Sequence, residues 1–150
     1  MTENETGRSP DSHFTRGVAR ETDEVVTDFP YSWFSKNALT PFTAAPGIVM
    51  QSFSGGALMV NWVTIEPNRP IPRHQHPHEQ IGVMIEGAME LTIGDETRLL
   101  RAGDAYNVPP NLPHGGRTLE EGCVVLDLFT PVREDYAALA RSAAESDSAG

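Results

Sequence analysis

Residues 72–87 read P-R-H-Q-H-P-H-E-Q-I-G-V-M-I-E-G and hold three of the five histidines of the chain, His74, His76 and His78. The segment lies between two stretches that are typical of β-strands. In an extended chain, successive side chains point to opposite faces, so His74 and His76 share a face. Two imidazoles on one face are close enough to bind one ion, and the spacing therefore predicts a metal site.

Further candidate ligands lie on the far side of a proline. Pro77 interrupts the strand pattern because it cannot donate a ladder hydrogen bond. Beyond it, His78, Glu79 and Gln80 each offer a third ligand, and His114 offers another from a distant turn. A small β-barrel can bring such groups together in its mouth. The alternative is a turn with surface histidines, but three histidines within five residues favour metal ligation.

Composition limits the class of protein and its partners. A chain of 150 residues with 39% hydrophobic content predicts one domain with a core. The net charge of −10 argues against nucleic acid as a partner. The single cysteine, Cys123, lies in an apolar run, which predicts a core position and fits a reducing cytoplasm. No apolar stretch suits a membrane span or a signal peptide, so we expect a cytoplasmic protein without a membrane partner.

Three regions are expected along the chain. Residues 1–24 are polar and without periodicity, which predicts a flexible N-terminal tail. A β-barrel domain is expected over residues 25–145, and residues 146–150 are expected to fray. The first part of the domain, residues 25–34, is apolar and aromatic, which predicts a strand that packs across the barrel or onto a second subunit. We therefore expect a homodimer.

Short strands separated by Gly, Pro and Asp turns predict an all-β fold, either an antiparallel barrel or a sandwich. A loop is expected at residues 66–73 and a hairpin about Gly87. Residues 133–145 are rich in alanine and predict one short amphipathic helix. The strand candidates are residues 48–53, 57–65, 81–86, 88–93, 97–101, 105–108 and 122–129.

The last predicted strand offers a second group of functional residues. Asp127 and Phe129 share one face of it, and Arg133 follows the next turn. If this strand and His114 edge one pocket, a carboxylate for proton transfer, an aromatic wall and a cation for a substrate carboxylate meet beside the ion. In the structural alternative, Asp127 pairs with an arginine and Phe129 belongs to the core. Spacing alone leaves both interpretations open.

Two motifs resemble those of the cupin superfamily: H-x-H-x3-Q-x6-G in residues 74–87 and G-x5-P-x4-H in residues 103–114. The resemblance implies a single-domain jelly-roll barrel, the double-stranded β-helix, that holds one divalent metal ion. Nickel, zinc, iron and manganese all suit its ligands. Three imidazoles and a neutral amide leave the ion its full charge, which favours Lewis-acid work over redox chemistry. The implied ligands are His74, His76, Gln80 and His114.

A narrower resemblance covers residues 48–136. Three motifs are similar to the KdgF group of cupins: H-P-H-E-Q at 76–80, P-P-N-L-P-H-G at 109–115 and E-E-G-C-V-V-L-D-L-F-T-P-V-R-E-D-Y at 120–136. That group acts in pectin and alginate breakdown, where it converts the ring form of 4,5-unsaturated monouronates to the linear keto form. The resemblance implies that the family's essential aspartate, phenylalanine and arginine correspond to Asp127, Phe129 and Arg133.

The resulting hypothesis is a metal-dependent isomerase that acts on a small anionic substrate. The substrate carboxylate pairs with Arg133 or Arg73, one of its oxygens binds the ion, and Asp127 moves a proton between the anomeric hydroxyl and the enol. Phe129 shapes the pocket and limits water. Three alternatives remain: an iron-dependent dioxygenase, against which Gln80 counts, another isomerase or cyclase, and a cupin that binds a small molecule without catalysis.

Overall fold

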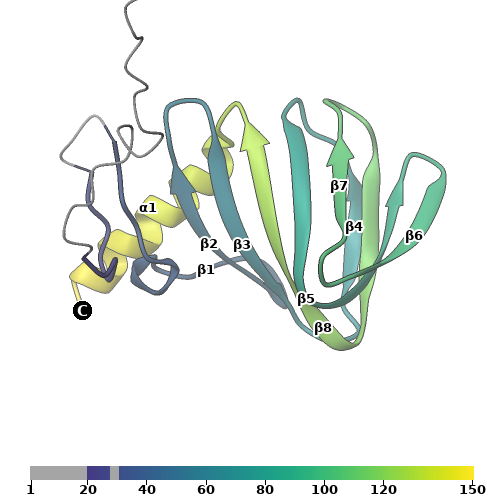
Figure 1. Cartoon of the computed structure of the whole chain (residues 1–150), viewed down its shortest axis with the longest axis horizontal. Coiled ribbons are helices and arrows are strands. Elements are labelled where there is room, and N and C mark those ends of the chain that lie inside the picture. Colours follow the sequence, from purple (N-terminus) through teal and green to yellow (C-terminus); the bar gives the residue numbers. More distant parts are fainter. Residues whose placement is uncertain (1–19, 28–30) are drawn as a thin grey trace, which may run out of the picture.

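The computed structural model describes residues 20–27 and 31–150, so the expected tail over residues 1–24 lies almost entirely outside the described residues. Eight strands form one curled antiparallel sheet in the order β1-β2-β3-β8-β5-β6, with β4 paired to β8 and β7 paired to β5 (Figure 1). This is the expected all-β jelly-roll architecture. The elements are a 3-10 turn Lys36–Ala38, β1 Phe42–Ala45, β2 Ile48–Ser54, β3 Met59–Ile65, β4 Pro70–His74, β5 Glu79–Ile93, β6 Glu96–Arg101, β7 Ala105–Val108, β8 His114–Thr130 and α1 Glu134–Ser148.

Strands β5 and β8 form a long antiparallel ribbon that carries much of the barrel. At one end Gln80 pairs with Phe129, and at the other end Ile93 pairs with His114. At about 3.3 Å per residue, the two ends of a straight ribbon would lie roughly 40 Å apart. Gln80 and His114 nevertheless line the same cavity. The ribbon is therefore folded back on itself, and this fold brings distant parts of the sequence together.

Two facing glycines produce the bend. Gly87 has φ +75° and Gly122 has φ +63°, both in the left-handed region, and the strand register shifts on either side of Gly87. A Cβ atom at Gly87 would lie 2.1 Å from the carbonyl oxygen of Gly122, which leaves no room for a side chain. The expected hairpin about Gly87 is therefore wrong: β5 runs through this residue as one bulged strand.

The expected loop at residues 66–73 is also wrong in part, because its second half belongs to β4. Two prolines, Pro70 and Pro72, suggested a loop. Strand β4 pairs with β8 alone among the described strands, and such an edge position tolerates residues without an N–H donor. Strand β8 likewise begins at His114 and not at residue 122, because the strand continues through the bend at Gly122 and does not start there.

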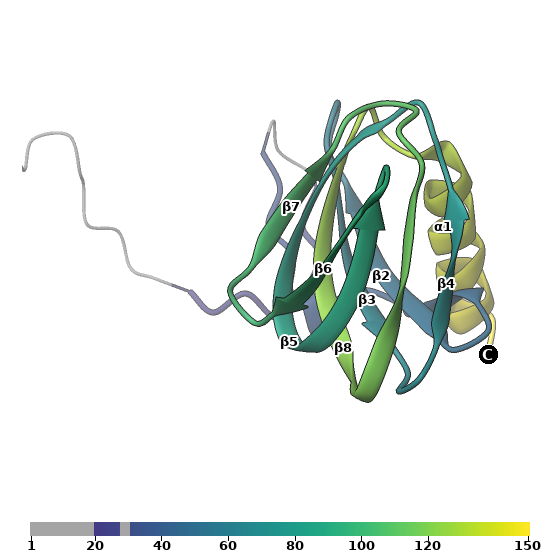
Figure 2. The same ribbon diagram turned by 90° about the vertical axis from the view of Figure 1, so that its right-hand side faces the viewer.

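The interior is apolar, and α1 lies along one side of it. Figure 2 shows the helix on the side of the barrel opposite β7. Tyr136, Ala140 and Ala143 on the helix pack against the buried cluster. The helix confirms the expected one and extends beyond residue 145 to Ser148. Cys123 is 5% exposed, as expected for a core residue, and burial raises the pKa of its thiol to about 11. No helix in the described part of the chain has the length and apolar character needed to cross a membrane.

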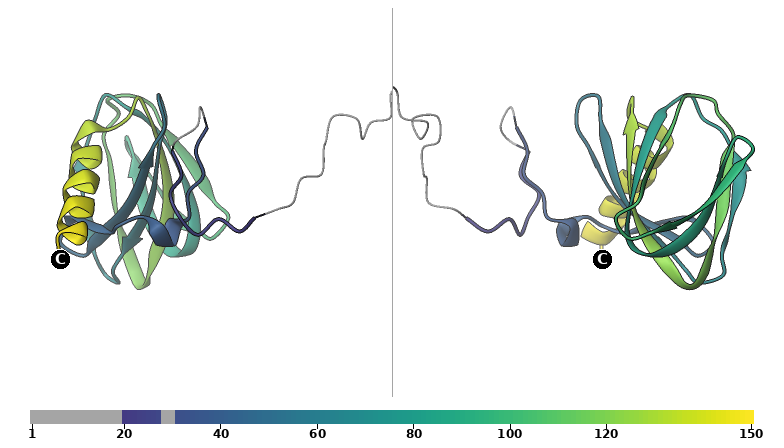
Figure 3. Two further views of the ribbon diagram at one scale, coloured as in Figure 1. Left: turned by 90° about the vertical axis from the view of Figure 1, so that its left-hand side faces the viewer. Right: turned by 45° about the vertical axis from the view of Figure 1, so that its right-hand side comes forward.

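The aromatic N-terminal segment forms little regular structure within the described residues. Its pairing there is an isolated bridge between Val26 and Trp33, with residues 28–30 outside the description. Phe34 stacks on Phe53 with ring centroids 4.0 Å apart, whereas Trp33 is 59% exposed. Figure 3 shows the segment as an extended piece beside the barrel. Within the described residues the expected strand is therefore reduced to one bridge, and Phe34 packs on the barrel through Phe53 and Trp62.

Candidate metal centre

Three histidines from different parts of the chain meet in the barrel. His74 ends β4, His76 lies in the connection to β5, and His114 begins β8, where it pairs with His74. One ring nitrogen of each lies within 4.8 Å of those of the other two. This distance suits ligands that share one ion, so the three imidazoles could hold a metal.

Each of the three imidazoles is oriented by a backbone carbonyl. A carbonyl oxygen can only accept a hydrogen bond, so Nδ1 carries the hydrogen in each ring and Nε2 keeps its lone pair. A hydrogen bond of this kind is the usual way in which a protein orients a histidine toward a metal. The Nδ1–H groups of His74, His76 and His114 donate to the carbonyl oxygens of Pro72 (2.7 Å), His78 (3.0 Å) and Leu112 (2.8 Å), respectively.

The Nε2 atoms, which are not used in these hydrogen bonds to the backbone, are placed to bind a cation. Nε2 of His114 is buried and has no hydrogen-bond partner among the described residues. Nε2 of His76 faces Oε1 of Gln80 at 3.1 Å, so two electron-pair donors point at each other. Burial, helped by the charge of Arg133, lowers the pKa of His76 to about 4, and burial also lowers the pKa of His114. Both rings are therefore neutral at pH 7, which is the form that binds a metal.

The structure separates the three candidates for the remaining ligand. Gln80 is 6% exposed and lines the cavity beside the histidines. Glu79 points the other way, where its carboxylate accepts a hydrogen bond from Asn107 at 3.1 Å. The ring of His78 lies 5.5 Å from that of His76, outside the group of converging nitrogens. The geometry thus brings Gln80 to the cluster and leaves Glu79 and His78 outside it.

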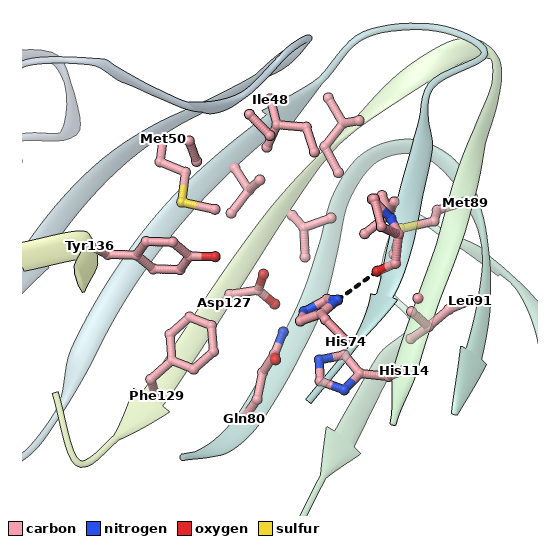
Figure 4. Close-up of a pocket in the computed structure, with 18 of the residues that line it drawn as sticks. Ile48, Met50, His74, Gln80, Met89, Leu91, His114, Asp127, Phe129 and Tyr136 are labelled. Carbon is pink, nitrogen blue, oxygen red and sulfur yellow. Dashed lines mark hydrogen bonds between the residues drawn. The ribbon is translucent and has the colours of Figure 1, made fainter. Parts of the chain in front are cut away.

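The predicted second group of residues lines the same cavity, whose volume is about 300 Å³. Asp127, Phe129 and Arg133 all contribute to its wall, together with His74 and His114. Figure 4 shows the Asp127 carboxyl pointing toward Gln80 and His74, with the Phe129 ring beside it. Asp127 is 9% exposed, and burial raises the pKa of its carboxyl. A buried carboxyl group therefore lies beside the candidate metal centre.

Tyr106 is a site residue that the sequence reasoning missed. Its hydroxyl donates a hydrogen bond to Oδ1 of Asp127 at 2.8 Å, and burial raises the pKa of the phenol. Tyr106 lies on β7, which pairs with β5 so that this tyrosine is opposite Gly82. A Cβ atom at Gly82 would lie 2.1 Å from the Tyr106 ring. A glycine inside the apolar β5 was the one available signal that another group approaches closely there.

Arg133 reaches the cavity in a fixed orientation. Its Nε and Nη2 donate to the two carboxylate oxygens of Asp135, at 3.2 and 2.7 Å. The guanidinium carbon lies 3.7 Å from the ring centroid of Tyr136 and 5.1 Å from that of Phe129. The carboxylate partner of this arginine is therefore Asp135 and not Asp127. The other candidate, Arg73, is exposed and lines a separate hollow beside β6 and β8.

Comparison with known proteins agrees with this geometry. The family model described as "Cupin domain" matches residues 61–129. The chain is 44% identical over 64 residues to the pectin degradation protein KdgF of Dickeya dadantii, a match that covers 42% of this chain and 58% of that protein. It is 36% identical over 66 residues to the H2HPP isomerase of Bacillus subtilis, a match that covers 43% of this chain and 28% of that protein. The chain thus spans less than two thirds of these two curated relatives.

Solved structures extend the comparison. The structure of KdgF from Halomonas sp. is similar with a TM-score of 0.61 and 35% identity, over 64% of this chain and 89% of that chain. An RmlC-like cupin from Shewanella frigidimarina has a TM-score of 0.65 at 24% identity, over 75% of this chain and 97% of that chain, and supports the fold alone. Taken together, the barrel, the family model and the identity to the Halomonas protein show that the chain belongs to the cupin superfamily, in its KdgF-like group.

Proposed function

We propose that this cupin is a metal-dependent isomerase that converts the ring form of a small unsaturated uronate to its linear keto form. The observation that carries the proposal is the position of Asp127, a buried carboxyl with a raised pKa in the same cavity as three converging imidazoles. A carboxyl whose pKa is raised by burial binds a proton more readily than a free aspartate does, which suits a group that takes up and returns a proton. The names of two relatives, a pectin degradation protein and an isomerase, support the same class of reaction.

The ligands in this proposal are the four converging side chains His74, His76, Gln80 and His114. They suit one divalent ion, such as nickel, zinc, iron or manganese. When bound, such an ion would polarise an oxygen of the substrate and stabilise negative charge on it. The neutral amide of Gln80 leaves the charge of the ion undiminished for this purpose.

The residues of the chain divide the remaining work. Arg133, held in place by Asp135, pairs with the carboxylate of the substrate at the rim of the cavity. Asp127 takes the proton of the anomeric hydroxyl as the ring C–O bond breaks and the ring oxygen becomes an enol oxygen. Returning a proton to the neighbouring carbon then gives the ketone, so that no atom is gained or lost. Tyr106 orients Asp127, and the Phe129 ring limits access of water.

Proton NMR of freshly released 4,5-unsaturated galacturonate tests this proposal. Three samples are compared: protein loaded with metal, protein stripped by a chelator, and no protein. We expect the vinyl signal to disappear faster in the first sample alone. Equal decay in all three would remove the uronate assignment. Oxygen uptake, measured in parallel, is expected to be absent, and stoichiometric uptake would identify a dioxygenase instead.

We also propose that the chain forms a homodimer through residues 25–34. Trp33 and Val25 are 59% and 40% exposed, and outward-facing Ile81 and Ile85 on β5 are 46% and 44% exposed. Exposed apolar side chains, aromatic ones above all, are enriched at protein interfaces.

Replacing Trp33 by serine is expected to weaken the dimer roughly tenfold or more, because an aromatic anchor is lost. Light scattering during size-exclusion chromatography over a range of concentrations measures this change. Leu99→Ser is the matched control, since Leu99 is 45% exposed on β6 and lies outside the proposed interface. Unchanged dissociation of Trp33→Ser would rule out this segment as the interface.

A cytoplasmic location is part of the same proposal. The single thiol, Cys123, is buried and protonated at neutral pH because burial raises its pKa to about 11. A chain without any disulfide suits a reducing compartment.

A further inference from the structure

The cavity is polar at one end and apolar over the rest of its wall. Figure 4 shows Ile48 and Met50 on the side of the Asp127 carboxyl away from Gln80, and Met89 and Leu91 beyond His74. Each of these apolar side chains is at least nine-tenths buried. They come from β2 and β5, and Val63 and Ile65 of β3 continue the same surface. Apart from Tyr136, whose hydroxyl lies beside Met50, the hydrogen-bonding side chains of the wall gather around the metal centre and Asp127.

This division matters for the choice of substrate. A uronate carries several hydroxyls in addition to its carboxylate, and each needs a hydrogen-bond partner when it leaves water. The apolar residues of β2, β3 and β5 offer no side-chain partner, and the Tyr136 hydroxyl beside them can serve only one such group. A ligand with a carboxylate at one end and an apolar body at the other leaves no polar group unpaired there. Discrimination of this kind can reach roughly 100-fold when one polar group is involved.

We propose that the same site also accepts the enol form of a 2-oxo acid with an apolar side chain and converts it to the keto form. The inference rests on the proposed function, because it uses the same metal cluster and the same carboxyl. The substrate carboxylate pairs with Arg133, and the apolar side chain occupies the wall formed by β2, β3 and β5. The cavity volume of about 300 Å³ suits a molecule of this size.

The step needs no group beyond those already in the site. The enol oxygen gives up its proton and becomes the C2 carbonyl, and the C2=C3 double bond becomes a single bond as C3 gains a proton. Asp127 takes the first proton and supplies the second, so the reaction is an isomerisation without oxidant or reductant. This is the second half of the uronate reaction, carried out on a different carbon skeleton.

Ketonisation of freshly prepared phenylpyruvate enol, followed by its ultraviolet absorbance, tests the inference with protein loaded with metal. We expect kcat/KM for this enol to exceed that for the enol of pyruvate, which lacks the apolar group, by roughly tenfold or more. The rate with 4,5-unsaturated galacturonate is measured on the same preparation. If the protein accelerates the reaction of the uronate but not that of phenylpyruvate enol, the inference is overturned and the proposed function stands. Acceleration of phenylpyruvate enol alone overturns the uronate assignment and keeps the inference, and failure with both overturns both.

A pair of matched variants tests the wall itself. Val63→Thr places a hydroxyl on the apolar surface with little change of shape, and Val49→Thr makes the same change on the outer face of β2, where Val49 is 38% exposed. We expect Val63→Thr to lower kcat/KM for phenylpyruvate enol roughly tenfold without a matching loss for the uronate, and Val49→Thr to lower neither. An equal loss for both substrates would overturn the role of this wall.

Binding of an unreactive acid gives a second readout that does not depend on turnover. Calorimetry with 3-phenylpropanoate is expected to show binding to the wild-type protein and to Val49→Thr, and roughly tenfold weaker binding to Val63→Thr. Thermal unfolding of each variant verifies that it is folded. No binding of 3-phenylpropanoate to folded wild-type protein loaded with metal would overturn the inference.

Discussion

Replacement of Asp127 by asparagine should reduce turnover roughly 100- to 10,000-fold while the metal content stays unchanged. The amide keeps the shape of the side chain and can still contact Tyr106, but it cannot take up and return a proton. Asp127 does not belong to the cluster of converging imidazoles, so the ion is expected to remain. The NMR assay with the uronate measures turnover, and elemental analysis of the purified protein measures its metal content.

Glu79→Gln is the matched control for this variant. It makes the same change of acid to amide, on a residue that points away from the cavity and contacts Asn107. We expect its turnover and metal content to equal those of the wild-type protein. Retained turnover in Asp127→Asn would remove Asp127 from its proposed role. Loss of metal from that variant would show that Asp127 supports the ligands.

Replacement of His76 by alanine has the second large expected effect, loss of both metal and turnover. His76 is 8% exposed, and its Nε2 atom lies 3.1 Å from Oε1 of Gln80, so the two atoms could bind one ion side by side. An ion at 100 times its dissociation constant stabilises a folded protein by about 2.7 kcal/mol. We therefore expect added zinc or nickel to raise the melting temperature of the wild-type protein and to leave that of His76→Ala unchanged.

His78→Ala is the control for a general effect of losing a histidine. His78 is only two residues away but lies outside the converging cluster. It is expected to keep its metal and the rise in melting temperature. If His78→Ala lost the metal while His76→Ala kept it, His78 and not His76 would be the ligand.

The pairs His74–His76 and Asp127–Phe129 were predictable because they depend on short-range rules, whereas His114 joins the cluster only through the folded β5–β8 ribbon. His74 and His76 are two residues apart, as are Asp127 and Phe129, and alternation in an extended chain places each pair on one side. Strand β7 was predicted with its exact bounds because Gly103-Asp104 and Pro109 mark both ends. Gly87 was misread because a glycine with positive φ is equally typical of a turn and of a bulge. The choice depends on the partner strand, which lies 35 residues further along the chain at Gly122.

Residues that reach the site through pairing with distant strands were not predictable. Tyr106 contacts Asp127 only because β7 lies against β5 at Gly82, a register that no local pattern specifies. The ion pair of Arg133 with Asp135 depends in turn on where α1 begins. Sequence reasoning thus identified the groups that are proposed to carry the chemistry, whereas the groups that orient them depend on tertiary structure.

Because the β5–β8 ribbon is folded, the affinity of the proposed metal site would depend on residues far from its ligands. Gln80 and His114 belong to opposite ends of the ribbon, and they meet only while Gly87 and Gly122 keep their left-handed conformation. An ion bound to both Gln80 and His114 would stabilise the bent conformation of the ribbon. The free energy needed to reach that conformation would therefore weaken the binding of the ion. The stiffness of the backbone at the two glycines would therefore be one of the quantities that set the affinity of the proposed metal site.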